Sequence, residues 1–181
     1  MRVVIVGGGL ATALATTQAG SAVMLHERSP ELVDEGAGIS LAPNATRILH
    51  HIGIGPDPEA TWVTAPMTEY RHYRRGKVII RMMSRDLRAL FGSPHLRLHR
   101  RDLQVAMMRR LAEVAPGTLR LGFRVVGVVP RNGHAGVRFA EGRDEIADVV
   151  VAAEGWSCRG IPPIRCCPSS VRGRPTPWRT P

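Results

Sequence analysis

Residues 3–27 read VVIVGGGLATALATTQAGSAVMLHE, and this stretch decides the fold. The apolar run at residues 3–6 predicts a strand, three glycines follow it, and the Ala-rich segment after them predicts a helix. A second apolar run that ends at Glu27 predicts a second strand, parallel to the first. A strand, a glycine-rich turn, a helix and a strand open a dinucleotide-binding β–α–β unit. The chain is therefore expected to hold an adenine dinucleotide.

Three features of this stretch have a physical role in such a site. Gly7 allows the tight turn out of the strand, and Gly9 lets the backbone approach a diphosphate. The following helix directs the positive end of its dipole at the phosphates. Glu27 lies twenty residues after Gly7, where a carboxylate reaches a ribose 2′-hydroxyl.

One position departs from the GxGxxG fingerprint. Thr12 stands where the third glycine normally lets helix and strand pack closely, and its β-branched side chain is expected to push the helix outward. The segment between Gly9 and Gly20 is also short for a crossover helix, by about one turn. A glycine-rich turn in another kind of α/β domain is the alternative interpretation of this stretch.

The chain has a strongly basic composition. Its 181 residues include 25 Lys+Arg and 15 Asp+Glu, and Lys77 is the only lysine. Proteins that bind single-stranded nucleic acid interleave cations with aromatic side chains, whereas these arginines are scattered and aromatics make up only 4% of the chain. We expect no nucleic-acid partner. A dinucleotide phosphate or an anionic substrate is a simpler reason for the excess arginine.

The expected location is the cytoplasm, with no membrane partner. Arg2 and the apolar run after it imitate a secretory signal, but three consecutive glycines and the continuation to Glu27 favour the β–α–β unit. No other stretch is long enough to cross a bilayer. The cysteines lack the spacing of a zinc site or a redox motif, which favours a reducing compartment; they are Cys158, Cys166 and Cys167.

No metal site is expected. His95 and His99 are four residues apart, which would suit a metal on a helix. The stretch between them alternates like a strand, and a strand holds the two rings about 13 Å apart.

Apolar periodicity predicts two further helices. The first begins at Pro43 and ends at Gly53, and its apolar face contains Ala45, Ile48, Leu49 and Ile52. The second begins after Asp102 as N-cap, and its apolar face contains Leu103, Met107, Leu111 and Val114.

Alternating segments predict the remaining strands. Residues 39–41 are a short extended piece, and residues 68–73 and 78–82 are the two strands of an antiparallel hairpin. Residues 119–149 resemble a meander, with turns at residues 132–133 and 141–142. Residues 149–153 are continuously apolar, which is typical of a parallel strand buried on both faces.

The domain expected from these patterns covers residues 1–159, with the hairpin near residues 68–82 as an excursion from it. Residues 160–181 contain six prolines and four arginines but no acid and no periodic apolar pattern. We expect them to be a disordered or out-of-frame tail.

Four segments, in this order, resemble the FAD-dependent aromatic hydroxylases of the p-hydroxybenzoate hydroxylase fold, most closely the salicylate hydroxylase-like branch. They are VVIVGGGL followed by HER, GAGISLAPNATRIL, LHRRDL, and the strand that ends at Glu154 and Gly155. The resemblance implies an α/β fold: a Rossmann-like FAD-binding β–α–β fold with an antiparallel β meander. It is incomplete here, because members of the family are much longer and carry a second flavin signature in their C-terminal half.

The resemblance also implies roles for residues at the adenosine end of FAD. Gly7 and Gly9 would face the diphosphate, and Glu27 would bind the ribose. Arg28 would lie beside the adenine, and Val126 would offer its backbone to it.

A second set of residues would lie near the flavin. Gly38 and Ile39 would bring backbone close to the ribityl chain and the flavin. Arg100 would reach the phosphate or ribityl region, with Gln104 one turn further along. Glu154 and Gly155 would occupy the positions of the family's Asp-Gly pair, which is linked to the function of FAD and NAD(P)H. Glutamate replaces the aspartate in this sequence. No residue is identified as catalytic.

The resemblance implies a monooxygenase that hydroxylates a small aromatic acid with FAD as cofactor, NAD(P)H as co-substrate and dioxygen. This chain would be the FAD-binding portion of that enzyme. Two alternatives stay open: a truncated, catalytically inactive dinucleotide-binding module, and an NAD-dependent oxidoreductase.

Overall fold

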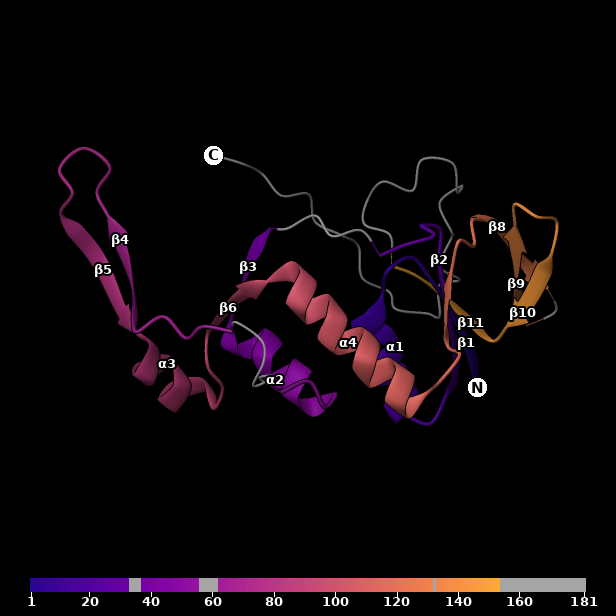
Figure 1. The fold of residues 1–181 in the computed structure, drawn as a ribbon, viewed down its shortest axis with the longest axis horizontal. Helices are drawn as coiled ribbons and strands as arrows, with labels where there is room; N and C mark the ends of the chain where they lie inside the picture. Colours follow the sequence, from indigo (N-terminus) through magenta and orange to yellow (C-terminus); the bar gives the residue numbers. More distant parts are fainter. Residues whose placement is uncertain (33–36, 56–61, 132, 154–181) are drawn as a thin grey trace, which may run out of the picture.

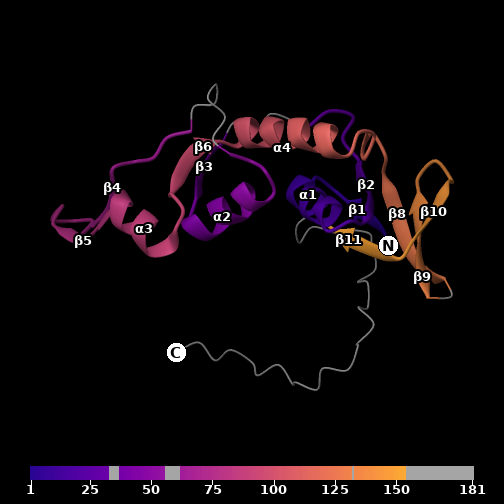
Figure 2. The same cartoon turned by 90° about the horizontal axis from the view of Figure 1, so that it is seen from below.

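The structure is a computed structural model that describes residues 1–32, 37–55, 62–131 and 133–153. Its centre is a parallel sheet with helices on one face and an antiparallel meander on the other (Figure 1). A separate group of short elements extends away from this centre (Figure 2). The mixed α/β fold and the meander predicted from the sequence are confirmed. The predicted tail, residues 160–181, lies outside the described residues.

The parallel sheet brings the ends of its strands to one edge. It contains β1 (Arg2–Val6), β2 (Ala22–Glu27), β7 (Leu119–Leu121) and β11 (Val149–Ala152), in the order β11-β1-β2-β7. β1 is central and buried on both faces, which is why its sequence is continuously apolar. Its last residue, Val6, is in register with both His26 and Ala152.

Two helices cover one face of this sheet. α1 (Leu10–Gln18) and α4 (Arg100–Val114) pack on each other and on the apolar residues that β1 and β2 point toward them. The core formed here includes Leu10, Leu14, Ile5, Leu25, Leu103 and Leu111. At about 25 cal/mol per Å² of apolar surface, this burial is the main stabilising contribution of the helices.

The meander covers the opposite face. It consists of β8 (Val125–Arg131), β9 (His134–Phe139) and β10 (Asp144–Ala147), paired antiparallel in the order β10-β9-β8. Val137 and Phe139 are almost fully buried against Val4 and Val6 of β1. Residues 119–121 were expected in the meander, and this was wrong: they form β7, which pairs parallel with β2.

The remaining elements form an extension that we call the arm, residues 38–99 without the gap at 56–61. It comprises β3 (Gly38–Leu41) paired antiparallel with β6 (Leu96–His99), α2 (Pro43–His51), the hairpin of β4 (Met67–Arg71) and β5 (Val78–Met83), and α3 (Ser84–Phe91). Figure 1 shows the hairpin at one end of the molecule and the meander at the other, with β3 and β6 between the hairpin and α4. The predicted hairpin is confirmed.

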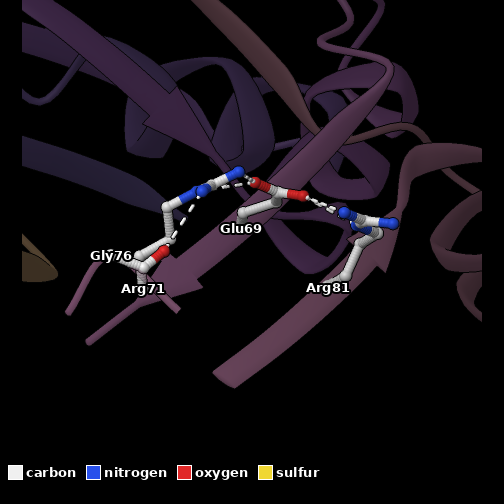
Figure 3. Close-up of polar contacts among 4 residues, drawn as sticks. All are labelled: Glu69, Arg71, Gly76 and Arg81. Atoms are coloured by element: carbon white, nitrogen blue, oxygen red, sulfur yellow. Dashed lines mark hydrogen bonds and ion pairs between the residues drawn. The ribbon is translucent and has the colours of Figure 1, made fainter. Parts of the chain in front are cut away.

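A charged cluster holds the two strands of the hairpin together (Figure 3). The Glu69 carboxylate on β4 accepts hydrogen bonds from Arg71 on the same strand and from Arg81 on β5. The hydrogen bonds from Arg71 and then Arg81 hold the pKa of Glu69 below its ordinary value of 4.5. Glu69 therefore stays ionised and is fully engaged by these two arginines.

The structure corrects the interpretation of the glycine fingerprint. Thr12 is exposed, so its β-branched side chain does not push α1 away from β1. The close approach occurs at Gly9 instead, where an added Cβ would lie 2.7 Å from Ala153 Cβ and 2.9 Å from Ile5 Cγ2. In this shortened helix Gly9 precedes the first helical residue and takes the packing role that we assigned to the third fingerprint position.

Two helix predictions were also partly wrong. Asp102 is not the N-cap of α4, because β6 runs directly into the helix and places His99 at that position; Asp102 lies in the first turn, where a carboxylate interacts favourably with the helix dipole. On α2, Ile48 is 58% exposed, whereas Thr46 is buried. The Thr46 hydroxyl donates to the Ala42 carbonyl, so its burial leaves no unpaired donor.

The strand β11 is parallel to β1, as predicted, but it is not buried on both faces. In the described part of the sheet it is the edge strand, and Val149 is 39% exposed. α3 was not predicted. Gly92, which ends it in the left-handed conformation at φ 69°, is the signal that could have revealed it.

Within the described ranges, no helix combines the length and the apolar character that a membrane crossing requires.

The close approach at Gly9 predicts a specific loss of stability. Gly9→Ala places a methyl group against Ile5 and Ala153, and overpacking of this kind is expected to lower the free energy of unfolding by about 2 kcal/mol. Urea unfolding followed by circular dichroism measures the change. Gly127→Ala is the matched control, because nothing lies within 4 Å of its added Cβ. An unchanged stability for Gly9→Ala would contradict the packing role.

Candidate functional site

A cleft of about 510 Å³ lies where the central strands end. Gly8 follows β1, Glu27 ends β2, and Ala153 follows β11, and all three line it. The rest of the lining comes from the first half of α4, the start of α1, β3 and the chain after β2; these residues are Leu10, Ser29, Glu31, Leu32, Ile39, Arg100, Leu103, Gln104 and Met107. A crevice at the carboxyl ends of parallel strands is where α/β sheets bind ligands.

The glycine loop has a compact, hydrogen-bonded geometry. Gly7 has φ 95°, a conformation that favours glycine, and its N–H donates to the His26 carbonyl at 2.8 Å. The Gly9 N–H donates to the Gly7 carbonyl at 2.7 Å, and the Leu10 N–H donates to the Gly8 carbonyl at 2.8 Å. The loop thus passes directly into α1, whose N-terminus opens into the cleft through Gly8 and Leu10.

The carboxylate of Glu27 is held in the cleft. Its Oε1 atom accepts a hydrogen bond from the Ser29 N–H at 2.9 Å. Its Oε2 atom lies 3.5 Å from the point where a Cβ on Gly8 would stand, so the carboxylate and the glycine loop face each other. One oxygen is therefore oriented by the protein, and the other is placed beside the loop.

Arg100 and Gln104 lie one turn apart on α4 and line the same cleft. Arg100 is the first residue of the helix, and its N–H donates to the Ala37 carbonyl at 3.0 Å, which ties α4 to the start of β3. In the described ranges no carboxylate lies within 4.0 Å of its guanidinium. Within the part of the chain that the structure describes, Arg100 is thus a cation without a carboxylate partner, which suits an anionic ligand.

The structure brings together some of the predicted residues. Four of them line the cleft: Glu27, Ile39, Arg100 and Gln104. Gly7 and Gly9 belong to the glycine loop but do not line the cleft, and Gly8 is the glycine that lines it. Gly38 lies on the exposed side of β3, and Arg28 is exposed beside Glu27 without lining the cleft.

One further predicted residue, Val126, is not brought to this cleft. Val126 lies on β8 and is 43% exposed, and it does not line the cleft. Glu154 and Gly155 lie outside the described residues. Leu103 and Met107 were predicted as core positions only, yet they also form a wall of the cleft. Ser29 was missed, although its position just after the carboxylate is a signal that could have found it.

A second, shallow cleft of about 370 Å³ adjoins the first. It is formed by the β3–β6 ribbon, and its lining residues are Gly38, Ile39, Ser40, Arg97, Leu98 and His99. Ile39 lines both clefts, so the two are neighbours across one strand.

A buried histidine supports the glycine loop from behind. His26 is fully buried and packs edge-on against Phe123 and Phe139. Its Nε2–H donates to the Glu145 carboxylate at 3.0 Å, and its Nδ1 atom is buried with no hydrogen-bond partner in the described part. Burial holds the pKa of His26 below 6.5, against the opposing attraction of Glu145.

The described residues contain no group of histidine, cysteine, aspartate and glutamate side chains that could hold a metal ion. His95 precedes β6 and His99 is the last residue of β6, so the stretch between them is a strand as predicted.

Comparison with known proteins finds FAD-dependent aromatic monooxygenases among the homologues of the chain. The chain is 32% identical to 3-amino-4-hydroxybenzoate 2-monooxygenase PtnB3 of Streptomyces platensis over 158 residues, which cover 85% of the chain and 39% of that protein. It is 29% identical to 6-hydroxynicotinate 3-monooxygenase of Pseudomonas fluorescens, covering 87% of the chain and 41% of the relative. No model of a protein family matches the chain.

Solved structures give the same result. HpxO of Klebsiella pneumoniae, complexed with FAD and uric acid, is similar with a TM-score of 0.71 and 26% identity, over 86% of this chain and 39% of that one. The tetrameric form of 2-methyl-3-hydroxypyridine-5-carboxylic acid oxygenase is similar with a TM-score of 0.66 and 27% identity, over 82% and 38%.

The fold and the cleft thus define a dinucleotide-binding α/β protein. More particularly, the chain is homologous to the N-terminal part of FAD-dependent aromatic monooxygenases, which confirms the resemblance found in the sequence. It spans about two-fifths of the length of the curated relatives that it matches.

The buried His26 predicts a pH dependence of stability. Because its pKa is lowered in the folded state, the unfolded chain binds more protons below pH 6.5, and stability is lost as the pH falls through that range. The difference in free energy of unfolding between pH 7.5 and pH 5.5, measured with urea, is expected to be smaller in His26→Gln than in the unsubstituted protein.

The control for this experiment is His134→Gln, which removes a half-exposed surface histidine that pairs with Asp148. An equally steep pH dependence of the free energy of unfolding in His26→Gln and in His134→Gln would contradict a neutral, buried imidazole at His26.

Proposed function

We propose that the chain is the FAD-binding portion of a monooxygenase that hydroxylates a small aromatic compound. The observation that carries this proposal is the meeting, in one cleft, of the helix N-terminus after β1, the Glu27 carboxylate and the Arg100 guanidinium. These are the donor and acceptor types that a dinucleotide requires: amides and a dipole for the diphosphate, a carboxylate for the ribose, and a cation for residual negative charge.

The residues present fit FAD. The Glu27 carboxylate, pre-oriented by the Ser29 N–H, would accept hydrogen bonds from the ribose hydroxyls. Gly8 leaves the cleft open beside it, because a larger side chain there would stand against the carboxylate. Arg100 and Gln104 would contact the phosphate or ribityl region, and the backbone of Gly38 and Ile39 would approach the flavin. Leu103 and Met107 supply an apolar wall that excludes water.

When bound, FAD reduced by NAD(P)H supplies the chemistry that activates dioxygen for insertion into a ring, and the protein positions the cofactor and the substrate. The substrate that we propose is a small, anionic aromatic acid. We place the protein in the cytoplasm, on the basis of the cysteine spacing. Residues 1–159 remain the proposed FAD-binding domain.

The second candidate function is a dinucleotide-binding module that performs no hydroxylation by itself, and the same cleft with its Glu27 carboxylate and Arg100 guanidinium supports it. Substrate-stimulated oxidation of NAD(P)H by the purified chain separates the two functions. An NAD-dependent oxidoreductase is the third alternative, and competition between FAD and NAD for the cleft tests it.

The proposal predicts FAD binding that depends on two side chains. Glu27→Gln and Arg100→Gln are each expected to weaken FAD binding by about tenfold, because each removes a charge-assisted hydrogen bond. Quenching of flavin fluorescence on titration with protein measures the affinity.

Arg85→Gln is the control, because the Arg85 side chain on α3 is 82% exposed and does not line the cleft. The affinity of the Arg85→Gln variant for FAD is expected to be unchanged. A chain that folds yet causes no change in flavin fluorescence would contradict the proposed function.

A further inference from the structure

The β3–β6 ribbon separates two kinds of surface. Its pairing register places Ser40 opposite Arg97 and Gly38 opposite His99. These four residues are all exposed, and residues opposite each other or two apart on a ribbon share a face. The other face carries Leu96 and Leu98, which are buried in the core with partly buried Ile39 and Leu41. The exposed face is therefore polar and lines the second cleft, beside the FAD cleft.

Arg97 is a cation on this face and, within the described ranges, forms no ion pair. Its Nη2 atom donates to the Thr68 hydroxyl at 3.4 Å, which is a weak hydrogen bond. Among the described residues no carboxylate lies within 4.0 Å of its guanidinium. The acid next to Thr68 is Glu69, and Figure 3 shows that both of its oxygens are engaged by Arg71 and Arg81. The guanidinium of Arg97 is thus left without a carboxylate partner in the described part of the chain.

A hydroxyl group is held at the same place. Ser40, directly opposite Arg97, shares a hydrogen bond of 2.7 Å between its Oγ atom and Nε2 of His95. This contact orients the Ser40 hydroxyl on the strand opposite Arg97, where facing Cβ atoms lie about 5 Å apart. A fixed hydroxyl beside an arginine matches the two oxygens of a carboxylate.

We propose that Arg97 is a specificity-determining residue that binds the carboxylate of an aromatic acid in the second cleft, assisted by Ser40. This rests on the proposed function, because the second cleft gains a role only from the flavin in the first. The two clefts share Ile39, so a ring anchored at Arg97 would lie next to the cofactor cleft.

The charge and size of the cleft favour a carboxylate over a phosphate ester. Arg97 is the single arginine in its lining, which suits a monoanion better than a dianion. A volume of about 370 Å³ accommodates one substituted ring, and Ile39 and Leu98 are the apolar residues of its lining. Arg100, three residues further along the chain and the first residue of α4, lines the other cleft, so the passage from β6 into α4 places one arginine at each cleft.

The experiment compares an acid with its neutral analogue. Binding of 4-hydroxybenzoate and of 4-hydroxybenzamide to the full chain with FAD is measured by isothermal titration calorimetry. The unsubstituted protein is expected to bind the acid about tenfold more tightly than the amide. Arg97→Gln is expected to remove this preference by weakening binding of the acid alone. Arg97→Lys is expected to retain part of it, and Arg85→Gln all of it.

Affinity for FAD is measured on the same preparations, so that the two proposals can fail separately. Arg97→Gln is expected to bind FAD as the unsubstituted protein does, because Arg97 does not line the FAD cleft. An equal preference for the acid in Arg97→Gln and in the unsubstituted protein, with FAD bound, would overturn the role of Arg97 only. Absence of any preference in the unsubstituted protein would also overturn it. A failure to bind FAD would overturn the proposed function itself.

Discussion

The close contact at Gly9 is the constraint on which the rest of the structure depends. Because Gly9 has no side chain, the start of α1 can rest on Ile5 of β1 and on Ala153 beyond β11. This contact places the helix N-terminus at the ends of the parallel strands, where Glu27 and Gly8 meet. Without it, the helix would move away from the sheet, and the cleft would lose the dipole that faces it.

The two faces of the parallel sheet pack against different elements. One face packs on α1 and α4, and α4 in turn supplies Arg100 and Gln104 to the cleft. The other face packs on the meander through Phe139 and His26, and the His26 carbonyl accepts the hydrogen bond that holds Gly7 in its turn. The site is thus supported from both layers, and the arm adds the β3–β6 ribbon as the wall that separates the two clefts.

The sequence predicted the elements whose signal is local. The run at residues 3–6, the glycines after it, the hairpin and the meander each follow from periodicity and turn residues, and all are present. Glu27, Ile39, Arg100 and Gln104, whose motifs resemble those of a known family, line one cleft, and their roles toward FAD stay predictions. What the sequence could not show depends on distant contacts. The role of Gly9 depends on Ala153, the exposure of Ile48 depends on how α2 lies against the core, and the pairing of residues 119–121 with β2 depends on the whole sheet.

The central claim is that the cleft at the strand ends holds FAD with its ribose at Glu27 and its diphosphate at the glycine loop. A crystal structure of the chain grown with excess FAD tests it most directly. The account predicts density for the dinucleotide in this cleft, with a ribose hydroxyl within hydrogen-bond distance of the Glu27 carboxylate. An empty cleft, or a dinucleotide bound elsewhere on the chain, would contradict it.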